Sequence, residues 1–276
     1  MSNSAPQLPG DSDEEPGSWS AALPLVGLIP AAGRASRLGA LPCSKEIMPL
    51  DLTPGGARAQ GADGPRVVCH HLLECFTAAD IRQAFVVLRD GKWDIPSYLC
   101  REPVTGLDIA YVAVTSTDSV PESLSCARPF VANSRVAMGF PDVLFEPRDA
   151  FAHLARCQEE SGCDVALGLF PCATPWMTDM VELGEEGRVV DIQIRPATSQ
   201  LAFNWLLAVW GPRFTAFLSE AMVNPITGEK EFQLGTLFKQ AAAEGMDLRG
   251  VPFPDGYFLD IGTPEGYGEA LRRRSI

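Results

Sequence analysis

The stretch LPLVGLIPAAG, residues 23–33, limits the folds open to this chain. Its apolar residues run almost without interruption to a glycine, a pattern typical of a short strand buried on both faces. Strand-like and helix-like segments then alternate along the chain. Strands are predicted at 84–88, 107–114, 135–140, 164–170, 203–210 and 247–253, helices at 67–79, 147–162, 212–222 and 231–244, and a hairpin at 180–194. This alternation favours βαβ units, and therefore an α/β fold with a mainly parallel sheet.

Composition divides the chain into a tail and one folded domain. Residues 1–22 are rich in Ser, Pro, Gly, Asp and Glu, so we expect a disordered acidic tail followed by a single domain over residues 23–276. The first residues lack the basic start and apolar stretch of a secretory signal, and no run approaches the ~20 apolar residues that span a bilayer. The eight cysteines form no C-x-x-C pair, and we expect reduced thiols in a cytoplasmic protein with no membrane partner.

The charge balance argues against one class of partner. The chain has 22 Lys and Arg against 35 Asp and Glu, a formal net charge of −13, and its basic run at 272–274 lies at the C-terminal end. A nucleic-acid polymer is bound by a clustered Lys and Arg footprint, which this sequence lacks. A few well-placed cations still suffice to bind a small anionic ligand such as a nucleotide.

The turn after the first predicted strand has the composition of a phosphate-binding loop. Small residues let successive backbone N–H groups approach a phosphate, and two cations, Arg37 and Lys45, follow them. The small residues are Ala31, Ala32, Gly33, Ala35 and Ser36. Two familiar phosphate motifs fit poorly, because Lys45 is followed by Glu46 instead of Ser or Thr, and the glycine spacing of a dinucleotide fingerprint is absent. The sequence therefore argues against a dinucleotide-dependent dehydrogenase, the weakest of three candidate functions; the other two are described below.

Two motifs, GRASRL (33–38) and SKEIMPL (44–50), follow this strand. They resemble the sugar-1-phosphate nucleotidyltransferases, and within them the glucose-1-phosphate thymidylyltransferase-like branch, and the likeness extends over residues 24–276. The resemblance implies a Rossmann-like three-layer α/β/α nucleotidyltransferase fold with a mixed, mostly parallel central sheet. It also implies that the small-residue turn and Arg37 bind a nucleoside triphosphate. Lys45 would offset charge on the α-phosphate and on the leaving pyrophosphate.

The same resemblance implies two metal-binding aspartates. Asp142 follows a predicted buried strand, where the family carries a metal-binding Asp after Gly, although two residues are inserted here. Asp260 lies in FLDIGTPEGYGEA (258–270), which is similar to a second family signature. Hard cations such as Mg²⁺ prefer carboxylate and phosphate oxygens, so Mg²⁺ is the expected cofactor. Without a metal, Asp142 is a turn residue and Asp260 ends a strand before a helix capped by Thr263.

The acceptor side matches the family less well. Arg195 stands where the family often has a Lys that binds the sugar phosphate, and Glu182 matches a Glu beside the sugar-contacting strand. Asp179 replaces a usual Gly, and residues 117–122 replace the Gly-containing stretch that contacts the base. The resemblance therefore assigns sugar-phosphate binding to Glu182 and Arg195. It leaves the sugar and the base open, with dTTP or UTP favoured.

The expected activity is Mg²⁺-dependent transfer of a nucleotidyl group from a nucleoside triphosphate to a sugar 1-phosphate, with release of pyrophosphate. The expected partners are these two small molecules, and homo-oligomerisation stays open. The alternative is a non-catalytic module of the same fold that binds nucleotide or nucleotide-sugar as a sensor or regulatory subunit. The altered acceptor residues favour that alternative, whereas the joint presence of both cations and both aspartates argues against it.

Overall fold

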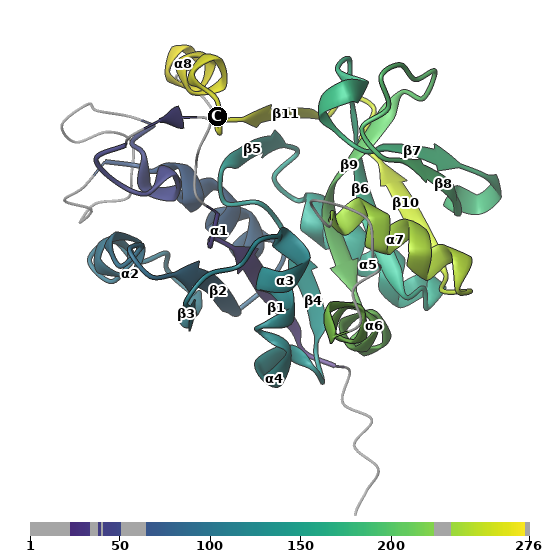
Figure 1. Ribbon diagram of the computed structural model, residues 1–276, viewed down its shortest axis with the longest axis horizontal. Helices are drawn as coiled ribbons and strands as arrows, with labels where there is room; N and C mark the ends of the chain where they lie inside the picture. The colour runs from purple at the N-terminus through teal and green to yellow at the C-terminus, as the bar shows by residue number, and fades with distance from the viewer. Residues whose placement is uncertain (1–22, 34–37, 40, 51–64, 224–232, 274–276) are drawn as a thin grey trace, which may run out of the picture.

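The computed structural model describes residues 23–33, 38–39, 41–50, 65–223 and 233–273. The predicted tail (1–22) and most of the loop between the first strand and the first helix (51–64) lie outside the described residues. Within these ranges, strands and helices follow one another from β1 to α8 (Figure 1). No helix in the described ranges has the length and apolar character needed to cross a bilayer.

A mixed sheet forms the centre of the molecule (Figure 1). Its main path runs β10–β6–β9–β4–β1–β2–β3, and β7 and β8 join it beside β9. β1 pairs in parallel with β2 and β4, β2 with β3, and β6 with β10, whereas β9 lies antiparallel between β4 and β6. The strands are β1 (Leu25–Pro30), β2 (Gln83–Arg89), β3 (Asp108–Val114), β4 (Arg135–Met138), β6 (Val165–Pro171), β7 (Met180–Leu183), β8 (Val189–Gln193), β9 (Phe203–Trp210) and β10 (Leu248–Pro252). The predicted α/β class with a mixed, mostly parallel sheet is confirmed.

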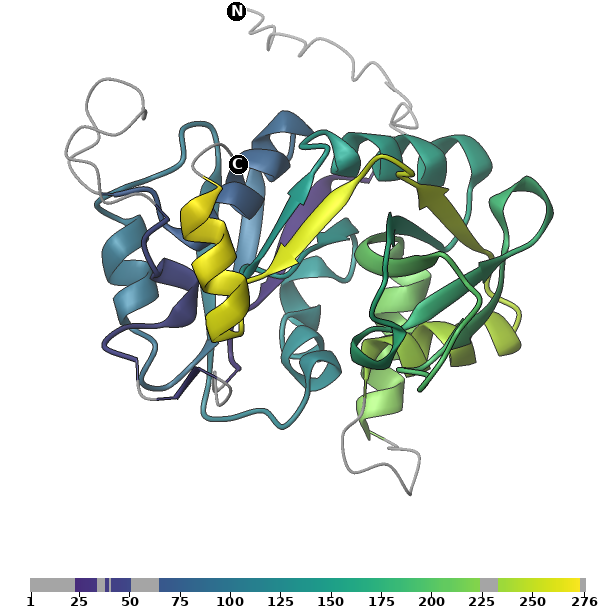
Figure 2. The same cartoon turned by 90° about the horizontal axis from the view of Figure 1, so that it is seen from above.

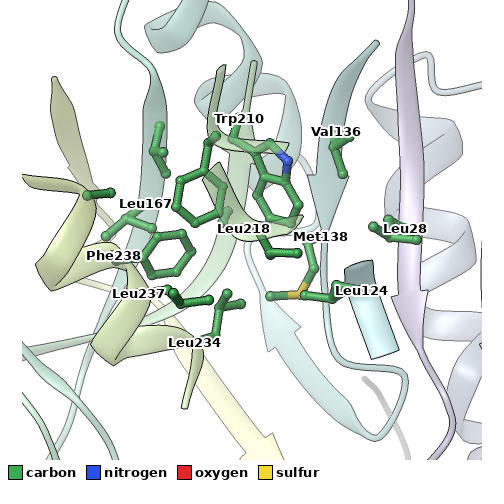
Figure 3. Packing of buried hydrophobic residues seen from close by; sticks show 14 of the residues in the cluster. Leu28, Leu124, Val136, Met138, Leu167, Trp210, Leu218, Leu234, Leu237 and Phe238 are labelled. Carbon is green, nitrogen blue, oxygen red and sulfur yellow. The ribbon is translucent and has the colours of Figure 1, made fainter. Parts of the chain in front are cut away.

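Helices cover both faces of this sheet. Successive residues of a strand point to opposite faces, and Leu28 and Ile29 of β1 accordingly enter two separate apolar clusters. One cluster, shown in Figure 3, includes side chains from α3, α4, α6 and α7, and the other includes side chains from α1, α2 and α5. The helices are α1 (Val68–Ala78), α2 (Asp94–Leu99), α3 (Val120–Ser125), α4 (Arg128–Val131), α5 (Ala150–Ser161), α6 (Pro212–Val223) and α7 (Leu234–Ala243). The predicted three layers are present.

A second, two-stranded sheet lies next to the central one. β11 (Tyr257–Asp260) pairs antiparallel with β5 (Val143–Glu146), and β11 leads into α8 (Pro264–Arg272), yellow in Figure 2. The Thr263 Oγ1 accepts a hydrogen bond from the Gly266 N–H at 3.1 Å, so Thr263 caps α8 as predicted. A small apolar cluster links β5, β11 and α8 to the turn that carries Lys45. The C-terminal segment is therefore packed against the region that follows the first strand.

The structure adds elements that the sequence pattern does not predict. Helices α2, α3 and α4 are four to six residues long, as is β5, and such short segments contain too little periodicity to identify. The antiparallel direction of β9 is also new, because an apolar run indicates a buried strand but not the direction of its neighbours. The longer predicted segments are present, among them the helix at 67–79 (α1), the hairpin at 180–194 (β7 and β8) and the strand at 203–210 (β9).

Candidate active site

A cavity of about 630 Å³ opens at the carboxyl ends of β1 and β4. In open α/β sheets, ligands bind at this edge, where the strand order reverses. Here the reversal lies at β1, which has β2 on one side and β4 on the other. The walls come from the turn after β1, the Lys45 turn, the β4–β5 turn, residues 117–123, the start of β9 and the first residues of α7. One cavity thus gathers segments that are far apart in the sequence.

Most predicted site residues that the structure describes meet in this cavity. They are Ala32, Gly33, Lys45, Asp142, Arg195 and Asp260. Ala31 lies beneath the wall, 1% exposed, and its N–H donates to the Val87 carbonyl at 2.8 Å, which fixes the end of β1 against β2. Ala35, Ser36 and Arg37 lie outside the described residues, and their roles stay predictions.

Lys45 provides a cation inside the cavity. It begins a short 3₁₀ turn (Lys45–Ile47), and its ammonium donates to Asp142 Oδ2. Burial alone would lower the pKa of Lys45, but Asp142, with Glu46 and Asp260 nearby, raises it above its ordinary value. Because an ammonium has three N–H donors, the contact with Asp142 leaves donors for phosphate oxygens.

The segment after β2 holds the Lys45 turn from both sides. The Asp94 carboxylate accepts hydrogen bonds from the Ser44 N–H at 2.6 Å and the Ser44 Oγ at 2.7 Å. Lys92 Nζ donates to Glu46 Oε1 at 2.7 Å, and these two residues are 4% and 1% exposed. Burial lowers the pKa of Lys92 and raises that of Glu46. The chain neighbours of Lys45 are therefore both fixed, which positions its ammonium.

Strands β5 and β11 bring the two aspartates together. Asp142 directly precedes β5, Asp260 ends β11, and the antiparallel register sets Asp260 opposite Val143. The Ile261 N–H donates to the Asp142 carbonyl at 3.0 Å, and the Gly262 N–H donates to Asp260 Oδ1 at 2.7 Å. No group of three or more His, Cys, Asp or Glu forms a metal site within the described ranges. A cation held by these two carboxylates would complete its shell with substrate or water oxygens.

One wall of the cavity comes from residues between 117 and 123, which include the segment 117–122 where the family resemblance implies contacts to the base. The Ser119 Oγ caps α3 by accepting from the Glu122 N–H at 3.2 Å, and Glu122 Oε2 accepts from the Asp118 N–H at 2.7 Å. The Thr117 and Ser123 hydroxyls are 2.6 Å apart. Local hydrogen bonds therefore hold the side chains of Thr117, Ser119, Glu122 and Ser123 in this segment.

The other end of the cavity contains Arg195 and Asp179. Arg195 has a backbone φ of 38°, in the left-handed region that a side chain disfavours, and its N–H donates to Asp179 Oδ1 at 3.3 Å. Trp205 Nε1 donates to Asp179 Oδ2 at 3.2 Å. Burial raises the pKa of the Asp179 carboxyl against the opposing effects of Trp205 and Arg195. Glu182 is exposed on β7 and does not line the cavity, unlike the other predicted acceptor residue, Arg195.

Solved structures share this architecture. A provisionally assigned glucose-1-phosphate thymidylyltransferase from Bacillus anthracis, solved in complex with sucrose, superposes with a TM-score of 0.75 over 91% of this chain and 96% of its own, at 15% identity. A UDP-glucose pyrophosphorylase complexed with UDP-glucose gives a TM-score of 0.73 over 91% of this chain and 98% of its own, at 18% identity. The fold is that of the sugar-1-phosphate nucleotidyltransferases. No protein-family model matches the chain, and no curated protein matches its sequence.

Within this nucleotidyltransferase fold, the structure adds residues to the site. Asn204, Trp205 and Gln233 line the cavity, as does Asp179, and none of them stands out in a short motif. Two signals were available in the sequence: Asn204 is a polar residue inside the apolar strand FNWLLAVW, and Asp179 stands where the resemblance expects Gly. Neither signal says that the two residues share one cavity, because they meet only when β7 and β9 pair.

Proposed function

We propose that this chain catalyses transfer of a nucleotidyl group from a nucleoside triphosphate to a sugar 1-phosphate, with release of pyrophosphate. The observation that carries the proposal is the meeting of Lys45, Asp142 and Asp260 in one cavity at the carboxyl edge of the sheet. The fold shared with sugar nucleotidyltransferases supports it. Of the nucleotides, dTTP or UTP is favoured by the sequence resemblance, with the segment 117–122 facing the base.

The reaction is a substitution at the α-phosphorus. An oxygen of the acceptor phosphate forms a new bond to the α-phosphorus while the bond to the bridging oxygen of pyrophosphate breaks, and that oxygen leaves with the bonding electron pair. Such a step needs positioning and charge neutralisation more than covalent catalysis. Lys45 donates hydrogen bonds to the α-phosphate and the leaving group, Arg195 binds the acceptor phosphate, and Arg37 binds the triphosphate. Gly33 and its small neighbours leave room for the nucleotide.

Asp142 and Asp260 are the residues that would hold Mg²⁺. The donor set fits this ion, because both are carboxylates, they occupy adjoining positions on paired strands, and they lie beside the proposed phosphate site. When bound, Mg²⁺ neutralises charge on the phosphates. Lys45 already contacts Asp142, so the side chains that would bind the phosphate and the cation are held together before substrate arrives.

A pyrophosphate-release assay tests this proposal. The protein is mixed with Mg²⁺, each nucleoside triphosphate in turn and a panel of phosphorylated acceptors that includes glucose 1-phosphate. We expect release that depends on both substrates and falls by at least ~100-fold in Asp142→Asn. The matched control is Asp255→Asn, an exposed aspartate in the turn before β11, which should retain the wild-type rate. Unchanged turnover in Asp142→Asn would remove Asp142 from the metal site.

The second candidate function is a non-catalytic module that binds nucleotide or nucleotide-sugar. The exposure of Glu182 favours it, because one of the two predicted acceptor residues does not reach the cavity. Tight nucleotide binding by calorimetry, together with no pyrophosphate release from any acceptor, would establish this function instead of catalysis.

A further inference from the structure

The acceptor end of the cavity contains a buried carboxylate, Asp179, that makes no ion pair with a described residue, although the charge of Arg195 acts on it. Asp179 is 8% exposed, and among the described residues no Lys, Arg or His side-chain nitrogen lies within 4.0 Å of its carboxylate oxygens. Its two hydrogen bonds come from neutral donors, the Arg195 N–H at 3.3 Å and the Trp205 Nε1–H at 3.2 Å. A carboxylate has about four acceptor positions, and these two donors occupy two of them. A buried carboxylate that makes no ion pair is stabilised most by a bound cation.

The surroundings of Asp179 suit a cation as well. Trp205 and Phe140 both line the cavity, with ring centroids 6.0 Å apart and a tilt of 41°, and aromatic faces attract ammonium groups. Asn204 lines the same cavity, and its side-chain oxygen is buried without a hydrogen-bond partner among the described residues. Such an acceptor is a place where a ligand N–H can bind. Carboxylate, amide oxygen and aromatic rings all favour a donor with positive charge.

Asp179 also adjoins the residue proposed to bind the acceptor phosphate. Its Oδ1 accepts a hydrogen bond from the Arg195 N–H, the positive charge of Arg195 acts on the Asp179 carboxyl, and both residues line this end of the cavity. This arrangement matches a ligand with one anionic and one cationic group close together. A neutral hydroxyl can donate one hydrogen bond to Asp179 but cannot balance its charge, whereas an ammonium does both.

We propose that the acceptor is a phosphomonoester carrying a free, positively charged amine, and that Asp179 is the specificity-determining residue that binds this amine. The inference rests on the proposed nucleotidyl transfer, which leaves the amine unchanged and uses only the phosphate. Two chemical sources supply such a group, an amino sugar 1-phosphate and an aminoalkyl phosphate. Trp205 and Phe140 would contact the carbon atoms next to the amine in either case.

The test uses two matched pairs of acceptors. Glucosamine 1-phosphate is compared with glucose 1-phosphate, and phosphoethanolamine with 2-hydroxyethyl phosphate, by kcat/KM for pyrophosphate release. N-acetylglucosamine 1-phosphate adds a sugar whose amine is uncharged. We expect the amine member of at least one pair to be preferred by ~10-fold or more, and the pair identifies the source. Equal or better use of the neutral member in both pairs would overturn the inference.

The variant Asp179→Asn preserves the shape of the side chain and an acceptor for the Arg195 N–H. We expect it to reduce the preference within the amine-bearing pair to ~3-fold or less, while Glu185→Gln, an exposed carboxylate in the β7–β8 turn, leaves the preference unchanged. A preserved preference in folded Asp179→Asn would remove Asp179 from this role. If that variant does not fold, the wild-type comparison of the two pairs still decides whether the acceptor carries an amine.

Calorimetric titration separates this inference from the proposed reaction. If no acceptor gives pyrophosphate, nucleotidyl transfer fails as the function, and the same two pairs are titrated into the wild-type protein without nucleotide. Tighter binding of the amine member, lost in Asp179→Asn, would support the amine site on its own. Equal binding of both members, or binding of neither, would overturn it.

Discussion

The substitution Gly266→Ala tests how the C-terminal helix positions Asp260. Gly266 lies in the first turn of α8, and a Cβ added there would be 2.0 Å from the Asp260 carbonyl oxygen and 3.1 Å from its carbonyl carbon. These are backbone atoms, so no side-chain rotation relieves the contact. On the same helix, the nearest atom to a Cβ at Gly268 is the end of the Arg272 side chain, 3.8 Å away. The two glycines therefore form a matched pair.

The expected stabilities follow from these distances. Ala is favoured over Gly in a helix by about 1 kcal/mol, so Gly268→Ala should raise the free energy of unfolding by up to that amount. Gly266→Ala gains the same helix propensity but must shift β11 or α8, and overpacking of this kind costs about 1–3 kcal/mol. The free energies of unfolding of the two variants should therefore differ by about 1–3 kcal/mol, with Gly268→Ala the more stable.

Urea unfolding and pyrophosphate release measure the two consequences. Because Asp260 is a proposed metal ligand, a shift of its backbone should lower kcat in Gly266→Ala by ~10-fold or more, whereas Gly268→Ala should retain the wild-type rate. If Gly266→Ala is as stable and as active as Gly268→Ala, then α8 does not position Asp260, and the proposed role of this helix in the site is refuted.

Three further predictions concern ionisable groups in the core and in the cavity. Lys92→Met removes one partner of the buried Lys92–Glu46 pair and should lower the free energy of unfolding by about 3–5 kcal/mol. Adding Glu46→Leu in the same protein should restore most of this loss. Equal losses in the single and double variants would contradict the pairing. Burial, with smaller effects of Arg148 and Arg66, lowers the pKa of His71 from 6.5 to about 3. Only the unfolded state therefore binds this proton as the pH falls from about 6.5 towards 3. The free energy of unfolding should fall by up to about 5 kcal/mol over that range because of His71. Urea unfolding at several pH values should show a flatter acid limb for His71→Gln but not for the exposed control His153→Gln. Lys45→Met should lower kcat by ~100-fold or more, and a wild-type rate would exclude Lys45 from charge neutralisation.

Much of the fold could be predicted from the sequence because its longer elements are periodic or continuously apolar. The segment FNWLLAVW coincides with β9, and the helix predicted at 67–79 is α1. Strand direction could not be predicted in the same way. β9 runs antiparallel between β4 and β6, and this depends on contacts between segments that are far apart in the chain. The short β5 was not predicted, because four residues are too few to show a periodic pattern.

The residues of the site also fall into two groups, those that a local motif identifies and those that only the folded structure brings together. Lys45 and Asp260 lie in contiguous motifs, so their local sequence was enough to propose them, and the structure places both in one cavity. Asp179 and Asn204 have no such motif, because they reach the cavity through pairing of β7 with β9. Glu182 was proposed from its position in a similar segment, and it is exposed away from the cavity lining. Residue identity at a matching position does not fix which side chains of a hairpin face the ligand.

Mass analysis of the reaction products tests the central claim most directly. The protein is incubated with Mg²⁺, a nucleoside triphosphate and an accepted phosphomonoester, and the products are separated and weighed. The account predicts a diphosphate-linked product containing the nucleoside monophosphate and the acceptor, formed in equal amount with pyrophosphate and absent with Asp142→Asn. Nucleotide binding without any such product, across both sugar 1-phosphates and aminoalkyl phosphates, would contradict it.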